Sequence, residues 1–267
     1  MFVSTQVSSY DPDADIGGDA DMGRDDHDWS EMEARSSGNL WVKGDTIRVC
    51  FKLGSDAVVR GRVRQYAQMW ESYANIKFKF FTKKWPDEDS DVRIAFKKKK
   101  DGNNSQVGTN VLNVPEDRPT MNLNITHKTS KTETQRLVLH EFGYLLGCKH
   151  EHSSPAAKIK WNKPEVYKYY YLKCRWDEGK VDRNVLNITE TTQHSRFDKK
   201  SIMLYRIPPN LTLNGFSVPK AAGELSPTDK SFIAMMYPPD EVRCHRCKER
   251  IHTSHPNQGH KCQLKYI

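Results

Sequence analysis

The stretch of sequence that decides the fold is HEFGYLLGCKHEH, which runs from His140 to His152. Residues four apart on a helix lie on one face, so two histidines at that spacing can hold one metal ion, with a glutamate after the first as a base. A glycine three residues past the second histidine lets the chain leave the helix, and a third histidine three residues later can turn back to the metal. Every element of this long pattern is present except one, because Tyr144 stands where the second histidine belongs.

Apolar residues on both sides of this stretch follow the periods of strands and helices. A period of two predicts strands at 45–52, 76–81, 91–96 and 120–125. A period of 3.6 predicts a helix over 57–74, and a Ser-x-x-Glu capping pattern at Ser130 predicts that the motif helix runs from there to Gly147. Two further helices are expected to begin at Asn162 and at Ser226. This order indicates a twisted sheet with packed helices, an α+β fold.

A second segment points to a known family. Ser201-Ile202-Met203-Leu204-Tyr205 resembles the Met-turn of astacin-like metzincins, which are zinc metallopeptidases with the long histidine pattern on their active-site helix. Pro119–Leu123 resembles the edge strand that binds extended substrate in this family. Because residues 41–239 follow the family's order of segments, the chain is identified as astacin-like. The resemblance implies a metzincin-type α+β domain with an active-site helix and a Met-turn subdomain.

The resemblance also implies roles for single residues. His140 and His150 would be zinc ligands, and Glu141 would be the general base that acts on a metal-activated water. Tyr205 would stabilise the oxyanion of the transition state, and Met203 would underlie the metal site. The implied function is that of a zinc-dependent metalloendopeptidase that hydrolyses peptide bonds at one catalytic-type Zn²⁺ site.

Tyr144 puts this chemistry in question. Catalytic zinc takes three protein ligands, whereas a phenol oxygen reaches farther than an imidazole nitrogen and must lose a proton with an ordinary pKa of about 10. Three outcomes remain open: the metal shifts outward and takes Tyr144 as a phenolate ligand, it recruits His152, which is expected to lean away from the site, or the site is weak or empty. The alternative function is therefore a catalytically inactive relative that binds extended peptides or a protein partner.

Charge is distributed unevenly along the chain. Residues 1–40 carry ten Asp or Glu against Arg24 and Arg35, a net charge of −8, and since the whole chain carries +8, residues 41–267 carry +16. With few large apolar residues, 1–40 is expected to be a disordered acidic arm. The basic body suggests acidic peptide or protein substrates. Its lysine run at 97–100 has no interleaved aromatic residues, which argues against nucleic acid as a partner.

Neither a membrane span nor a secretory signal is expected. The mean hydropathy is −0.79, and no apolar run approaches the length that crosses a bilayer. The start of the sequence has no basic n-region and no apolar h-region. These features favour an intracellular location and exclude a membrane as partner.

Residues 240–267 change in composition to Cys, His and charged residues, which marks an appendage. Cys244-x-x-Cys247 followed by His260-x-Cys262 has the ligand types and the number of a tetrahedral structural zinc site. A metal would supply the stabilisation that so short a segment cannot obtain from a core of its own. The alternative is a Cys/His-rich tail that holds no metal.

Overall fold

The structure is a computed structural model that describes residues 39–97, 102–188 and 195–239, together with the backbone of 241–243 and 250–252. The acidic arm up to residue 38 lies outside this part of the chain. Cys244, Cys247, His260 and Cys262 also lie outside it, so the second zinc site stays a prediction. Within the described residues, no helix has the length and apolar character needed to cross a membrane.

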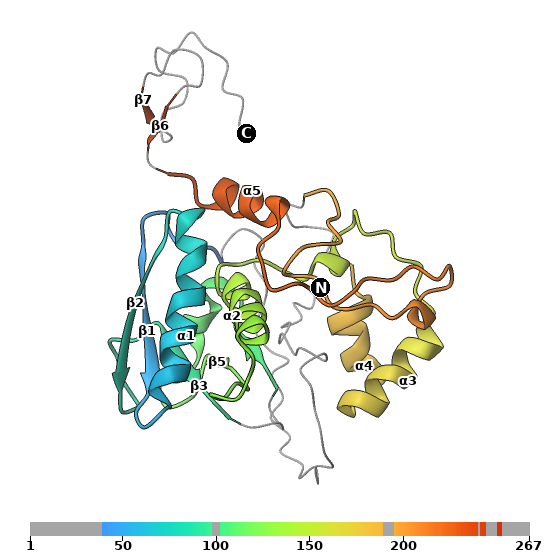
Figure 1. Cartoon of the computed structure of the whole chain (residues 1–267), viewed down its shortest axis with the longest axis horizontal. Helices are drawn as coiled ribbons and strands as arrows, with labels where there is room; N and C mark the ends of the chain where they lie inside the picture. The colour runs from blue at the N-terminus through green and yellow to red at the C-terminus, as the bar shows by residue number, and fades with distance from the viewer. Residues whose placement is uncertain (1–38, 98–101, 189–194, 240, 244–249, 253–267) are drawn as a thin grey trace.

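A five-stranded sheet forms one side of the molecule (Figure 1). Its strands are β1 (Thr46–Lys52), β2 (Lys77–Lys83), β3 (Val92–Ala95), β4 (Asn104–Ser105) and β5 (Met121–Asn122), in the spatial order β2-β1-β3-β5-β4. All neighbours pair in parallel except β4, which pairs antiparallel with β5. Ile47, Val49 and Phe51 of β1 are fully buried because alternate side chains of a strand point to the same face, here the face that packs in the core.

The α+β class predicted from the sequence is confirmed, but the predicted edge strand is wrong. The segment Pro119–Leu123 contains β5, which is enclosed between β3 and β4. The two edges of the sheet belong to β2 and β4, and β4 is the edge strand next to β5. β4 could not be predicted from the sequence because its two residues are too few to show a period of two.

One helix on the sheet begins at a capping residue and tightens toward its end. α1 (Ala57–Ala67) begins after Asp56, whose carboxylate accepts hydrogen bonds from two amides of the first turn at 2.8 and 3.3 Å. The chain continues as a 3-10 helix, η1 (Gln68–Ser72). The single helix expected over 57–74 is therefore an α-helix with a tighter continuation.

The motif helix runs through the interior beside α1 (Figure 1). α2 (Lys131–Leu145) begins after Ser130, whose hydroxyl accepts a hydrogen bond from the amide of Glu133 at 3.2 Å. Every residue from Arg136 to Leu145 is buried, so the helix is enclosed on all sides and holds its polar side chains inside the protein. The 3-10 turns η3 (Gly108–Asn113) and η4 (Glu151–Ser153) lie before and after it.

A second, smaller core lies on the other side of the molecule (Figure 1). It is formed with α3 (Lys163–Cys174), α4 (Glu178–Val181), the π-helix η5 (Asp182–Leu186) and the 3-10 helix η6 (Pro209–Leu211). Trp176 stacks on Tyr170 within this core, with ring centres 5.4 Å apart. The chain passes between the cores in the predicted Met-turn, because Met203 packs in the larger core and Leu204 in the smaller one.

α5 (Pro227–Met236) is the last helix that packs on the larger core. The hydroxyl of Ser226 accepts a hydrogen bond from the amide of Asp229 (3.0 Å), and the Asp229 carboxylate accepts one from the amide of Ser226 (2.9 Å), which forms a capping box. Further along the chain, β6 (Glu241–Arg243) and β7 (Arg250–His252) pair antiparallel as a separate sheet.

Candidate metal and catalytic site

The C-terminal half of α2 positions three candidate residues. His140 and Tyr144 are four residues apart and lie on one face of the helix, with ring centres 5.3 Å apart. Glu141 follows His140 and is completely buried. The C-terminal half of the helix therefore carries a ligand candidate, the base candidate and the substituted ligand position at three buried positions.

The chain reverses directly after α2 at Gly147, whose φ of +88° lies in the region that favours glycine. The Gly147 amide donates to the carbonyl of Tyr144 (2.8 Å), and the Cys148 amide donates to the carbonyl of Gly143 (3.0 Å), which is the Schellman arrangement. This reversal brings His150 back to the helix, with its ring centre 5.0 Å from that of Tyr144.

A turn at residues 201–205 contacts both parts of the motif. The carbonyl of Ile202 accepts a hydrogen bond from Nδ1 of His140 (2.8 Å). The carbonyl of Met203 accepts one from the amide of Glu151 (3.1 Å), the residue that follows the third histidine of the motif. The predicted Met-turn is therefore in contact with the helix and with the returning chain.

Asp229 of α5 holds this turn from the other side. Its Oδ2 accepts a hydrogen bond from the amide of Ile202 (2.9 Å), and its Oδ1 accepts one from the hydroxyl of Ser201 (2.7 Å). The Ser201 oxygen in turn accepts from the amide of Met203 (3.0 Å). Burial raises the pKa of Asp229, although these hydrogen bonds oppose the rise. Sequence reasoning missed this role; its one signal was the Ser-x-x-Asp pattern of the capping box.

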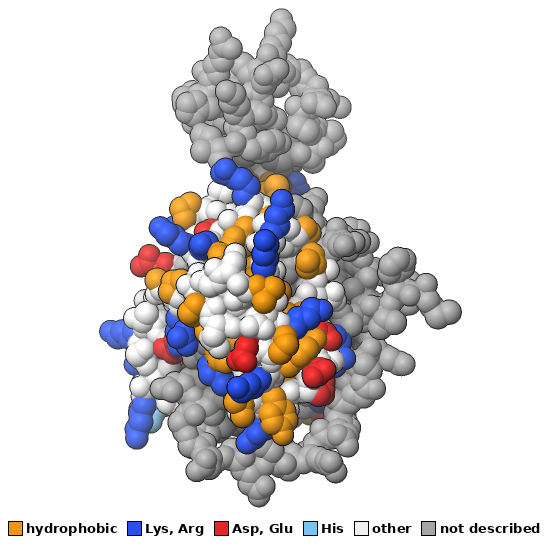
Figure 2. Space-filling model, turned by 90° about the vertical axis from the view of Figure 1, so that its right-hand side faces the viewer, with side chains coloured by type: hydrophobic (Ala, Val, Ile, Leu, Met, Phe, Trp, Pro, Cys, Tyr) orange, Lys and Arg blue, Asp and Glu red, His pale blue; other side chains and the backbone are white. Residues whose placement is uncertain are grey.

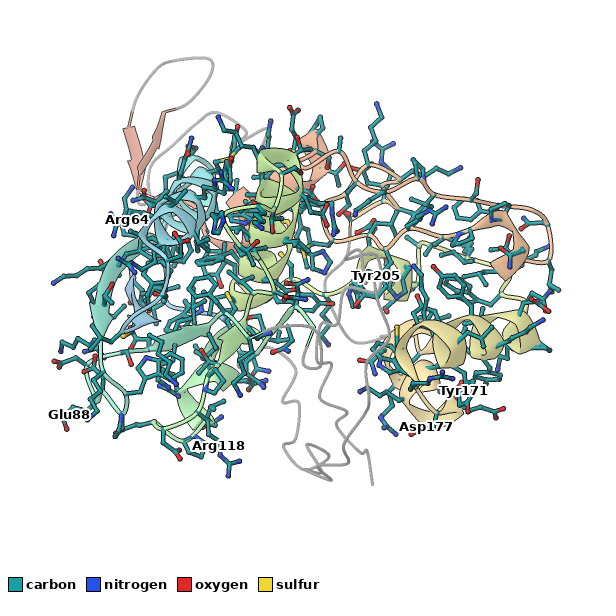
Figure 3. The ribbon with its side chains drawn as sticks, turned by 60° about the horizontal axis from the view of Figure 1, so that its bottom comes forward. Arg64, Glu88, Arg118, Tyr171, Asp177 and Tyr205 are labelled. Atoms are coloured by element: carbon teal, nitrogen blue, oxygen red, sulfur yellow. The ribbon has the colours of Figure 1, made fainter. Side chains whose placement is uncertain are left out.

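Five rings meet in the interior, and they belong to His140, Tyr144, His150, His152 and Tyr205. Each of these residues is at most 3% exposed. Figure 3 shows Tyr205 between the half of the molecule that carries the sheet and the half that carries Tyr171 and Asp177. His152 lies within the cluster, stacked on His150 at 4.7 Å, and does not lean away as the sequence suggested.

Hydrogen bonds fix the proton on two of the histidines. A carbonyl oxygen only accepts, so Nδ1 of His140 carries a proton and points away from the place where a metal would bind Nε2. Likewise Nε2 of His152, 3.3 Å from the carbonyl oxygen of Asn184, carries the proton of that ring. Burial, and then the neighbouring histidines, lower the pKa of His150 well below its ordinary value; burial lowers the pKa of His152 to about 4. At neutral pH both rings are therefore uncharged.

These features fit a zinc site at His140 and His150. Both ring nitrogens of His150 are buried and have no hydrogen-bond partner within the described part of the chain, which leaves a lone pair for a metal. Two imidazoles on one tetrahedral zinc, with Zn–N of about 2.0–2.1 Å, have ring centres about 5 Å apart. The observed separation of 5.5 Å is close to this requirement.

Tyr144 fits less well as the third ligand. A phenolate on the same tetrahedral zinc would set its ring centre about 5.5–6.5 Å from each histidine ring, depending on how far it bends at the oxygen, because that oxygen lies well beyond the ring. The observed separations are 5.3 Å to His140 and 5.0 Å to His150. The phenol ring thus occupies the place of an imidazole. In keeping with this, the described residues contain no group of three His, Cys, Asp or Glu side chains that could hold a metal.

The motif helix, its reversal at a glycine and the turn beneath it together define a metzincin-type metallopeptidase scaffold. The structure of myroilysin is similar to this one, with 40% sequence identity, a TM-score of 0.71, and 76% of this chain and 98% of that chain covered. A second crystal structure of myroilysin gives 40% identity and a TM-score of 0.58, over 76% and 87% of the two chains. The chain belongs to the astacin family of zinc metalloproteases, as the motif predicted.

A more distant structure shares the fold. It is high choriolytic enzyme 1, a hatching enzyme zinc-protease from the medaka fish Oryzias latipes, with 16% identity and a TM-score of 0.50 over 77% of this chain and 98% of that chain. No family model and no curated protein sequence matches the chain. Membership of the family supports a metalloprotease-type function with zinc as cofactor, and its protease homologues act on peptides or proteins.

Proposed function

We propose that this protein is a zinc-dependent metalloendopeptidase whose activity is impaired by Tyr144. The observation that carries the proposal is the pair of buried imidazoles of His140 and His150, of which His150 has a pKa well below its ordinary value because it is buried. Glu141 is buried and follows His140 on α2, and the ring centre of Tyr205 lies 5.8 Å from that of His140, which supports roles for them as base and oxyanion donor.

The residues of this chain would divide the work of peptide hydrolysis among them. Zinc at the two histidines would supply a Lewis acid and lower the pKa of water. Glu141 would take a proton from that water, since it follows His140 on α2. Tyr205 would donate a hydrogen bond to the developing oxyanion, and its ring is fixed 3.9 Å from that of His150.

The edge of the sheet supports an extended peptide as substrate. Among the described strands, β4 pairs with β5 alone and so forms one of the two edges of the sheet, where a peptide can add as a further strand. The charge of +16 on residues 41–267 favours acidic peptides. Figure 2 shows Lys and Arg side chains scattered over one face of the molecule, which suits general attraction of an acidic chain better than a nucleic-acid groove.

The second candidate function is a catalytically inactive protein that binds extended peptides or a protein partner. The position of the Tyr144 ring favours it, because a phenol in the place of an imidazole leaves two strong ligands where catalytic zinc takes three. Peptide binding at β4 would survive in such a protein, since the strand edge does not depend on the metal.

Restoring the missing imidazole tests the proposal. Tyr144→His is expected to raise zinc affinity by about 10–100-fold or more. Substitution of residues that only hydrogen-bond to the metal ligands already lowers metal affinity by that much. Cleavage of casein should rise with it, because a displaced reacting group costs much rate. Adding Glu141→Gln should abolish cleavage and leave zinc bound. If the unaltered chain already cleaves casein at a rate that Tyr144→His does not improve, the proposal that Tyr144 impairs activity is wrong. If Tyr144→His binds zinc and cleaves nothing, the proposal that the protein is a peptidase is wrong.

A further inference from the structure

The two candidate zinc ligands are oriented in different ways. His140 lies on α2 and donates through Nδ1 to the carbonyl of Ile202 at 2.8 Å. His150 lies in the irregular stretch after the helix, and neither of its ring nitrogens has a hydrogen-bond partner among the described residues. A metal-binding histidine is usually oriented by a hydrogen bond from its second nitrogen. The orientation of the His150 ring therefore depends on packing.

The ring that stacks on His150 is His152. Their ring centres are 4.7 Å apart and their planes differ by 25°. Tyr205 is closer, at 3.9 Å, but is tilted by 54°, and Tyr144 contacts His150 edge-on at 89°. Of these three neighbours, His152 alone is close to parallel, so its face restricts the tilt of the His150 ring.

His152 is itself held by the smaller half of the molecule. Its Nε2 lies 3.3 Å from the carbonyl oxygen of Asn184 in η5, and the side-chain amide of Asn184 donates to the carbonyl of Lys180 at 2.7 Å. The ring of Trp161 contacts His152 edge-on, at 6.2 Å and 88°. The position of η5 therefore determines where the His152 ring lies against the face of the His150 ring.

We propose that His152 is a positioning residue that fixes the ring of His150, and with it the direction of the His150 lone pair, by stacking. It also stacks on Tyr205, at 5.0 Å and 29°, so the same ring packs against a ligand candidate and the oxyanion-donor candidate. The inference rests on the proposed zinc site at His140 and His150. It gives His152 a role through its ring face and not as a metal ligand.

Two substitutions of His152 distinguish the contribution of its ring face to zinc affinity from that of its ring nitrogens. His152→Phe keeps a flat ring and loses both nitrogens, whereas His152→Ala removes the ring. Zinc affinity is measured by competition with a chromogenic chelator, in chains that also carry Cys247→Ser so that a second site does not contribute. We expect His152→Phe to stay within about threefold of its parent and His152→Ala to bind at least about tenfold more weakly.

A control variant distinguishes a specific loss of zinc affinity from general destabilisation of the smaller core. Val166 is fully buried in the smaller core, and Val166→Ala should lower the melting temperature without changing zinc affinity. Equal zinc affinity of His152→Ala and its parent would overturn the proposal. An equal loss of zinc affinity in His152→Phe and His152→Ala would also overturn it, because the ring nitrogens of His152 would then matter and not its ring face.

The experiment is run in the unaltered chain and in Tyr144→His, so that a weak parent site does not hide the effect. If neither background binds zinc, the proposed zinc site fails, and the metal-free protein still tests the positioning. Ring signals of His150 in ¹⁵N-histidine NMR should then be single and sharp in the parent and in His152→Phe, and broadened or doubled in His152→Ala. Identical signals in all three would overturn the inference.

Discussion

Tyr144 differs from an imidazole in reach and in protonation, and both differences bear on the site. Its ring centre lies 5.3 Å from that of His140 and 5.0 Å from that of His150, which are spacings close to those of two imidazoles on one metal, whereas the phenol oxygen lies farther from its ring centre than an imidazole nitrogen does. The residue is completely buried, and burial disfavours the charged phenolate unless a cation is already bound. The phenol therefore fills the position without supplying an equivalent ligand.

Tyr144→Phe tests whether the hydroxyl binds the metal at all. We expect zinc affinity to change by less than about threefold, since a phenolate ligand would require ring spacings larger than those observed. The measurement is a zinc titration of the metal-free chain against a competing chelator, with Tyr144→His as the reference for a complete site. A loss of tenfold or more in Tyr144→Phe would show that the phenolate is a ligand.

Among the secondary-structure elements, α2, the Met-turn and α5 form a packed series. Gly143 of α2 leaves room for the turn, because a Cβ there would lie 2.4 Å from the sulfur of Met203. Asp229 of α5 then binds the amide of Ile202 and the hydroxyl of Ser201 from the opposite side. The turn is fixed between two helices, and its carbonyls can hold the two parts of the metal motif in place.

Asp229→Asn is expected to lower the free energy of unfolding by about 1–3 kcal/mol, because the amide cannot replace every hydrogen bond that the buried carboxylate accepts. Zinc affinity should fall as well, since the carbonyl of Ile202 orients His140. Ser226→Ala is the matched control, because it removes the cap of the same helix and leaves Asp229 in contact with the turn. It should cost about 0.5–2 kcal/mol without loss of zinc affinity. Equal zinc affinity in the two variants would contradict this account.

Glu133, in the first turn of α2, gives a prediction about pH. Burial alone would raise its pKa, but the ion pairs with Arg136 (2.9 Å) and Lys220 (3.1 Å) outweigh this and lower it. Because the folded-state pKa is the lower one, its stabilisation is present above the ordinary value of about 4.3 and is lost as pH falls through the folded pKa. Urea unfolding should show that Glu133→Gln is less stable at pH 7 and that the difference shrinks toward pH 3. A difference that does not vary with pH would mean that the charge is not the cause.

At the scale of the whole molecule, the described residues form two cores, and the Met-turn at the candidate site contributes residues to both. The larger core holds the sheet, α1, α2 and α5, and the smaller one holds α3, α4 and η5. The start of the described chain is also attached to α2, because the indole nitrogen of Trp41 donates to the carbonyl of Leu145 at 2.8 Å. The end of the motif helix is therefore held by residues from several parts of the sequence.

The metal content of the full chain tests the expected second site in residues 240–267. Cys247→Ser should remove one zinc equivalent, measured by elemental analysis. A serine hydroxyl binds zinc far more weakly than the cysteine thiolate that it would replace. The melting temperature of the main body should stay unchanged, since the site belongs to the appendage. Unchanged zinc content would show that Cys244, Cys247, His260 and Cys262 form a tail without metal.

The sequence by itself determined the elements and features that depend on residues close together in the chain. The spacing of His140 and Tyr144 placed both on one helix face, because the helix repeat is fixed by backbone geometry. Ser130 and Gly147 marked the ends of the motif helix, because capping and reversal involve only a few neighbouring residues. The family followed from these local patterns together with the Met-turn segment.

The tertiary structure alone decided the contacts between elements far apart in the chain. It made β4 an edge strand of the sheet and enclosed β5, brought Asp229 to the Met-turn and stacked His152 on His150. No local period encodes these contacts, because they depend on how whole helices and strands dock on one another and on which polar groups must find partners once they are buried.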